Sequence, residues 1–127
     1  MDVTPLVAKD RQVIESYGAS GFRVSGHSYG GAILVLPQST RSLAVSAIAD
    51  ISAATLAPII AAGIQILLLG CGRHMQPVPP ALRQELRAHG VVVDAMDTGA
   101  ACRTYNVLLA EDRRVAAALL PAAVAGN

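Results

Sequence analysis

Cysteine, aromatic and charged residues are all scarce in this sequence of 127 residues. Two cysteines, Cys71 and Cys102, are too few for the disulfide framework of a small secreted domain, so we expect reduced thiols. The chain has no tryptophan, and its ten basic and nine acidic residues are scattered, so nothing predicts a nucleic-acid surface. No spacing of histidine, cysteine or carboxylate residues indicates a metal site, and we expect no cofactor.

Nothing in the sequence predicts a secretion signal or a membrane span. The first ten residues, MDVTPLVAKD, contain no basic stretch followed by an apolar run. Residues 51–72 carry no charge and approach the hydropathy of a membrane span, but Pro58 and Gly63 interrupt them. The run also changes from an Ala-rich to an Ile/Leu-rich composition. We therefore predict a soluble, cytoplasmic protein that does not insert into a membrane.

What the sequence does contain is apolar material for one core. Hydrophobic residues make up 53% of the chain, and its length suits one domain better than two. We expect a single domain over residues 1–127, with an ordered core of about residues 13–121.

The first half of the chain is predicted to be mostly β-structure. Residues 13–24 and 32–36 are strand-like and flank a Gly-rich stretch, which predicts an antiparallel hairpin. Residues 41–49 predict a further short strand. Ser52 is typical of a helix N-cap, and Gly63 of a helix end, so a helix is expected between them.

The second half alternates strands and helices. Apolar runs predict strands over residues 64–70, 91–95 and 113–121. Leu82 and Leu86 share one face of a helix that is predicted to open at Pro79–Pro80 and to end at Gly90. Thr98 is expected to cap a second helix, which continues to about residue 110. The pattern predicts an α/β fold with a mixed sheet, which includes one right-handed βαβ crossover between two parallel strands.

The stretch Gly26-His27-Ser28-Tyr29-Gly30 matches the Gly-x-Ser-x-Gly motif of serine hydrolases. That motif needs a helix after the serine, whereas an apolar run that ends at Pro37 follows here. The usual order of serine, acid and histidine is also missing. We therefore predict that Ser28 lies in the connection of a hairpin and takes no part in catalysis.

The loops after the two parallel strands are the best place for a ligand, because both open at the carboxyl edge of the sheet. Glycines permit close backbone approach, and a helix N-terminus with arginines beside it suits a carboxylate or phosphate. The candidate ligand-binding residues are Gly70, Cys71, Gly72, Arg73, Thr98, Arg103 and Asn106. Each also has a structural interpretation: Thr98 as a cap, Arg103 as a partner of Asp94 or Asp97, and the cysteines as apolar filler or as a pair that approach each other.

Two segments, Tyr17–Pro37 and Met96–Pro121, carry a family resemblance. It is most specific in Gly21-Phe22-Arg23, Tyr29-Gly30, Thr98, Ala101, Arg103, Thr104, Tyr105 and Asn106. With these residues the chain resembles a family of uncharacterised bacterial and archaeal domains that includes a mitochondrial assembly factor of NADH:ubiquinone oxidoreductase (complex I). Many relatives have a tryptophan shortly after the equivalent of Pro37, where this chain has Leu43.

The resemblance implies a three-layer fold with helices on both sides of a central mixed sheet. It also implies a non-enzymatic binding or assembly role with a protein partner, such as a subunit of a membrane complex. The alternative from the residues themselves is a domain, or an enzyme, that takes an anionic metabolite at the loops after the parallel strands. The sequence leaves the oligomeric state open.

Overall fold

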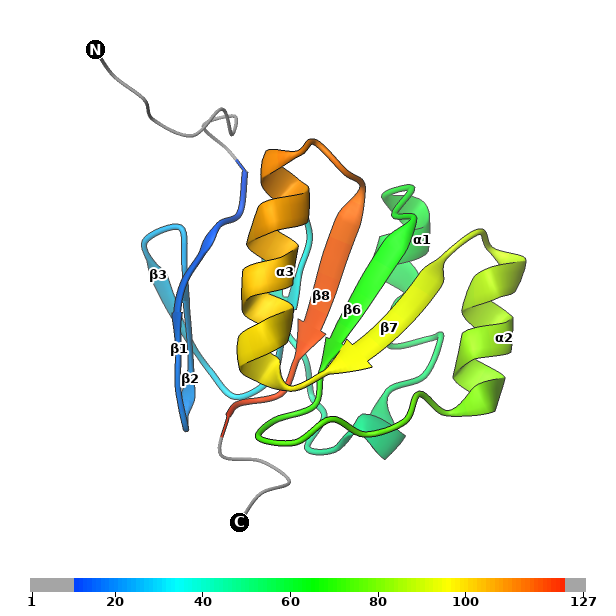
Figure 1. Cartoon of the computed structure of the whole chain (residues 1–127), viewed down its shortest axis with the longest axis horizontal. Coiled ribbons are helices and arrows are strands. Elements are labelled where there is room, and N and C mark those ends of the chain that lie inside the picture. Colours follow the sequence, from blue (N-terminus) through cyan, green and yellow to red (C-terminus); the bar gives the residue numbers. More distant parts are fainter. Residues whose placement is uncertain (1–10, 123–127) are drawn as a thin grey trace.

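The computed structural model describes residues 11–122, which form two sheets with helices on both sides of the larger one (Figure 1). The elements are, in chain order, β1 (Ile14–Tyr17), β2 (Gly21–Val24), β3 (His27–Gly30), β4 (Ile33–Val35), β5 (Thr40–Ser42), a 3-10 helix (Ile48–Asp50), α1 (Ala57–Ala61), β6 (Ile66–Gly70), α2 (Pro80–Ala88), β7 (Val92–Met96), α3 (Thr98–Ala110) and β8 (Val115–Leu119).

The small sheet is antiparallel, with the order β1-β2-β3. The hairpin that was predicted between residues 13–24 and 32–36 is therefore wrongly placed. The chain reverses at Ser25 and Gly26, whose φ angles are 44° and 85°, as in the two-residue turns that suit a twisted hairpin. Ser28 therefore lies within β3, opposite Arg23, and not in the connection. The Gly-rich stretch that was expected to be a loop forms β3, and β4 belongs to the large sheet.

The large sheet has the order β5-β4-β8-β6-β7. Strands β6, β7 and β8 run parallel, and β4 pairs antiparallel with β8. The predicted crossover from β6 through α2 to β7 is present. A second crossover, from β7 through α3 to β8, brings the last strand to the centre of the sheet. Every residue of β8 is buried, because its alanines are small enough to be covered on both faces.

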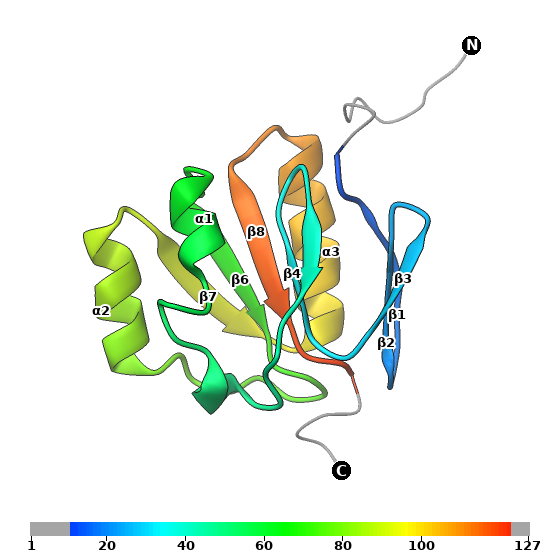
Figure 2. The same ribbon diagram turned by 180° about the vertical axis from the view of Figure 1, so that it is seen from behind.

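The large sheet is the middle of three layers, as expected (Figures 1 and 2). On one face, α1, α2 and the 3-10 helix cover a core that includes Leu56, Leu69 and Leu86. On the other face, α3 and the small sheet enclose a second core around Phe22 and Tyr105. Cys71 belongs to the first core and Cys102 to the second, so the two thiols lie on opposite faces of the sheet.

Two predicted elements in the middle of the chain are shorter than expected. Of residues 41–49, only the first two belong to a strand, and the 3-10 helix begins at Ile48. Helix α1 begins at Ala57 and not next to Ser52, because Pro58 suits the first turn of a helix and no later position. The Ser52 hydroxyl instead accepts a hydrogen bond from the Thr55 N–H within a turn. Gly63, with φ of 71°, ends α1 as predicted.

Both β6 and α2 agree with their sequence patterns. Leu82 and Leu86 are the buried residues of α2, and Gly90, with φ of 77°, follows its end. Among the described residues, no helix combines the length and the apolar character that crossing a membrane requires.

Candidate functional site

The loop after β6 and the start of α3 meet at the carboxyl end of the parallel strands, where the candidate ligand site was predicted. The Thr98 N–H donates to the Gly72 carbonyl at 2.8 Å, and the Gly72 N–H donates to the Thr98 hydroxyl oxygen at 2.8 Å. The Cys71 N–H donates to the Met96 carbonyl at 2.9 Å. The two predicted loops therefore share one edge, and they bond directly to each other there.

Thr98 joins three chain segments at this edge. Its side chain is fully buried, and its hydroxyl donates to the Leu120 carbonyl at 2.6 Å while it accepts from Gly72. The predicted role of Thr98 as the helix cap is wrong, because Asp97 is the N-cap and its carboxylate accepts from the Ala100 N–H at 2.9 Å. The Thr98 hydroxyl instead links the ends of β6 and β8 to the start of α3.

Gly70 and Gly72 are explained by close packing and by backbone conformation. A Cβ atom at Gly70 would come within 2.7 Å of the Leu119 side chain and 3.2 Å of the Thr98 Cα. Gly72 has φ of 89°, which favours glycine. An anion at this edge would have to displace the hydrogen bonds between Gly72 and Thr98.

Asn106 fastens β1 to α3. Its amide oxygen accepts from the Ile14 N–H at 3.0 Å, and its amide nitrogen donates to the Ile14 carbonyl at 2.8 Å. Both groups of the side chain therefore bond to the backbone of one strand residue. This pairing holds the small sheet against α3.

Arg103 and Arg73 are both exposed, but they have different surroundings. The Arg103 guanidinium donates to the Tyr17 hydroxyl of β1 at 3.2 Å, in place of the ion pair with Asp94 or Asp97 that the sequence left open. Arg73 lies in the loop that leaves the carboxyl end of β6 and precedes α2. Two of the seven candidate residues, Arg103 and Asn106, border a groove between α3 and β1.

This groove contains a residue that the sequence reasoning missed, Tyr17. The groove has a volume of about 360 Å³ and lies between β1 and α3, where its lining includes Tyr17, Arg103 and Asn106. Tyr17 is 42% exposed, and its ring lies so close to Gly99 that a Cβ there would be 2.5 Å from the tyrosine hydroxyl. No local motif indicated this contact, because Tyr17 and Arg103 are 86 positions apart.

Both cysteines are buried and free. Burial raises the pKa of the Cys102 thiol from 9.0 to about 12, against a smaller lowering by the charge of Arg103. Burial also raises the pKa of the Cys71 thiol, against hydrogen bonds with the Gln76 and Met96 backbone. A thiol with a raised pKa is a poor nucleophile and a poor metal ligand at neutral pH. Within residues 11–122, no three histidine, cysteine or acidic side chains are grouped as metal ligands.

Ser28 is exposed, and its hydroxyl accepts from the Arg23 guanidinium at 3.4 Å. The neighbouring His27 faces the Ser25 carbonyl through its Nδ1 atom at 3.2 Å. A nucleophilic serine needs a general base within hydrogen-bonding reach and an elbow between strand and helix. Ser28 lies between strand residues instead, so the local structure is not that of the hydrolase motif.

Comparison with known proteins identifies relatives over nearly all of the described chain. A family model described as "Protein of unknown function (DUF498/DUF598)" matches residues 14–120. An uncharacterised protein from Rhodobacter capsulatus is 37% identical over 108 residues, which are 85% of this chain and 83% of that protein. A solution structure of a Mth938-like domain from Bordetella pertussis superimposes with a TM-score of 0.79 at 33% identity, covering 96% of this chain and 93% of that one.

An assembly factor is among the relatives. NADH dehydrogenase [ubiquinone] 1 alpha subcomplex assembly factor 3 from Danio rerio is 35% identical over 111 residues, which are 86% of this chain. The match spans 64% of the assembly factor's own length. The family model, the identities and the shared fold agree, and the chain belongs to the DUF498/DUF598 family.

Proposed function

We propose that this protein is a non-enzymatic assembly factor that holds a partner polypeptide while a larger complex is built. The similarity to an assembly factor over 86% of the chain supports this role. Because the match leaves about a third of that factor's length uncovered, the partner and the complex are part of the proposal. A subunit of a membrane-bound NADH dehydrogenase is the partner that the relative's name suggests.

The groove between β1 and α3 is the surface that we assign to the partner. Tyr17 and Arg103 are exposed there and hydrogen-bonded to each other, and Val107, one turn further along α3, is 57% exposed. Tyrosine and arginine are enriched among the residues that dominate binding energy at protein interfaces. This exposed set is the observation that carries the assignment. The side chains of Asn106 and Thr98, by contrast, are hydrogen-bonded within the fold.

Association with a membrane would then occur through the partner. No helix in residues 11–122 can cross a bilayer, so this part of the chain would reach a membrane complex from one side. We propose the cytoplasm as its location. Washing isolated membranes with salt would release a protein held in this way, whereas a protein inserted in the bilayer would stay.

A photo-crosslinking experiment tests the assignment. Benzoylphenylalanine at Tyr17, introduced in cells of the organism that encodes the chain, is expected to crosslink to a subunit of the NADH dehydrogenase. The same probe at Arg87, which is exposed on α2 across the large sheet, is the matched control and should give no such product.

Deletion of the gene should also lower the amount of assembled dehydrogenase on native gels. A gene copy that carries both Tyr17→Ala and Arg103→Met should fail to restore it. Unchanged dehydrogenase after deletion would contradict the proposed function.

A further inference from the structure

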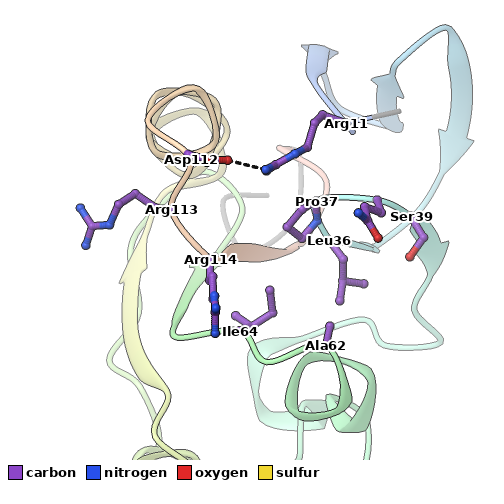
Figure 3. A pocket seen from close by; sticks show the side chains of 10 residues that line it. Arg11, Leu36, Pro37, Ser39, Ala62, Ile64, Asp112, Arg113 and Arg114 are labelled. Atoms are coloured by element: carbon purple, nitrogen blue, oxygen red, sulfur yellow. Dashed lines mark hydrogen bonds and ion pairs between the residues drawn. The ribbon is translucent and has the colours of Figure 1, made fainter. Parts of the chain in front are cut away.

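A cavity of about 510 Å³ lies at the opposite end of the molecule, where the parallel strands begin (Figure 3). We call it the amino-end cavity; its lining includes Leu36, Pro37, Ile64 and Asp112 and the three arginines Arg11, Arg113 and Arg114. Its volume is within the range of sites that take small ligands or single side chains of a partner. It is distinct from the groove between β1 and α3, so it does not depend on the proposed function.

The cavity combines an apolar wall with three arginines. Leu36, Pro37 and Ile64 supply aliphatic surface, and Figure 3 shows Arg114 beside Ile64 and Arg11 reaching toward Asp112. Arg11 forms an ion pair with Asp112 between Nη2 and Oδ1. Only 21% of the Arg11 side chain is exposed, against 84% of that of Asp112.

Arg114 has no counterion among the described residues. Within residues 11–122 its guanidinium has no hydrogen bond or ion pair, although its backbone carbonyl accepts from the N–H groups of Gln65 and Ile66. The paired main chain anchors the residue at the start of β8, while the side chain lies along the cavity beside Ile64. Arg113 also borders the cavity, but Figure 3 shows its side chain extending away from Leu36 and Ile64, whereas that of Arg114 lies beside Ile64.

The charges around the cavity attract an anion. Three arginines, Arg11, Arg113 and Arg114, border it against one acid, Asp112, which is paired with Arg11. A planar guanidinium can bind a carboxylate through two parallel hydrogen bonds. Asp112 and the carboxyl end of α3, which carries a partial negative charge, oppose a doubly charged group such as phosphate. The apolar wall requires a hydrocarbon body beside the charged group.

We propose that the amino-end cavity binds a carboxylate that carries a short apolar body. The carboxylate binds the Arg114 guanidinium, and the hydrocarbon lies against Leu36, Pro37 and Ile64. A free monocarboxylic acid and the C-terminus of a polypeptide share this chemistry. The experiment below separates these two sources.

The test is an NMR titration of the isotope-labelled chain with hexanoate. Saturable shifts are expected at the backbone amides of Gln38, Ser39 and Ile64, which border the cavity. Hexanamide, which keeps the hydrocarbon but lacks the charge, and inorganic phosphate, which lacks the hydrocarbon, should both bind more weakly. No saturable shifts at these amides by about 10 mM hexanoate, above the range of weak specific sites, would overturn the proposal.

Two arginine variants make the test specific. Arg114→Met is expected to weaken hexanoate binding about tenfold, which is the loss of one charge-assisted interaction. Arg113→Met removes the same charge from the neighbouring residue and should leave the affinity nearly unchanged. Equal weakening by both variants would show attraction to net charge alone and would refute the site.

A blocked dipeptide with a free C-terminal carboxylate identifies the source of the ligand. Tighter binding of this dipeptide than of hexanoate, with loss of binding when it is amidated, assigns the cavity to a polypeptide terminus. Tighter binding of hexanoate assigns it to a free acid. In both cases the same amides respond and Arg114→Met weakens the binding.

Discussion

The two ends of the parallel strands differ in how their polar groups are used. At the carboxyl end, the Thr98 hydroxyl, the Gly72 backbone and the Leu120 carbonyl are joined by buried hydrogen bonds. At the amino end, Arg114 lines a cavity of about 510 Å³ and its guanidinium has no hydrogen-bond partner within residues 11–122. The end that resembles a ligand site in the sequence is closed by the fold, and the other end is open.

The difference shows what a local motif can and cannot indicate. A Gly-rich loop next to a helix N-terminus is a typical anion site, because unpaired N–H groups point toward the ligand. Here Asp97 and the Gly72 carbonyl take N–H groups of that terminus. The amino-end cavity has no local motif, because Arg11, Pro37, Ile64 and Arg114 come from four separate segments.

The largest loss of stability is expected when the hydrogen bonds that close the carboxyl end of the parallel strands are removed. Thr98→Val keeps the shape of the side chain and leaves the Gly72 N–H and the Leu120 carbonyl without their partner. Each buried group that loses its hydrogen bond costs about 1–3 kcal/mol, so for the two groups we expect the free energy of unfolding to fall by about 2–6 kcal/mol. Urea unfolding followed by circular dichroism measures it.

Thr104→Val is the matched control for that measurement. Thr104 is on the same helix and partly exposed, and its hydroxyl has no hydrogen bond within the described residues. A change of less than about 0.5 kcal/mol is expected. If Thr98→Val were as mild as the control, the carboxyl end would not be locked by this hydroxyl, and a ligand could enter there.

A pH-dependent effect of intermediate size is expected from Cys102, which lies in the first turns of α3 at the closed end. Burial raises the pKa of its thiol from 9.0 to about 12. Below about pH 9 both the folded and the unfolded state keep the proton. Between about pH 9 and 12 only the unfolded state loses it, so stability falls as pH rises, by up to about 1.4 kcal/mol per pH unit.

Urea unfolding at about pH 8 and about pH 10.5 compares the wild type with Cys102→Ala. The variant removes the thiol, so its stability should decline less between the two pH values, whatever its stability at the lower one. Parallel declines would mean that the Cys102 thiol is not shielded from water and that this part of the closed end is open.

The second half of the fold could be predicted from the sequence because its signals are local. A continuous apolar run predicts β6, the spacing of Leu82 and Leu86 predicts the buried face of α2, and Gly63 and Gly90 mark helix ends. The three-layer arrangement was expected from the family resemblance alone. Neither source indicated that β8 would lie between β4 and β6, which depends on long-range pairing.

Side-chain roles were harder to predict, because their partners are far away in the sequence. Asn106 bonds to Ile14, and the Tyr105 hydroxyl lies 2.9 Å from the Gln12 carbonyl, so both residues hold the first described segment against α3. A Cβ at Gly21 would collide with the Tyr29 carbonyl. Most residues that carry the family resemblance are therefore explained by the fold, while Arg103 and Arg23 stay exposed.

The smallest effect is expected at the open end, for Arg114→Met. Methionine keeps much of the aliphatic stem of the arginine, and the lost charge has no ion pair within residues 11–122. The free energy of unfolding should therefore change by no more than about 0.5 kcal/mol, as for exposed residues away from specific interactions. Urea unfolding of Arg114→Met beside Arg113→Met measures it. A loss above about 1 kcal/mol in Arg114→Met alone would show that the guanidinium stabilises the fold, and weaker hexanoate binding by that variant would then have a structural explanation. Near-native stability together with weaker binding would place the role of Arg114 in recognition, at the end of the sheet that the fold leaves open.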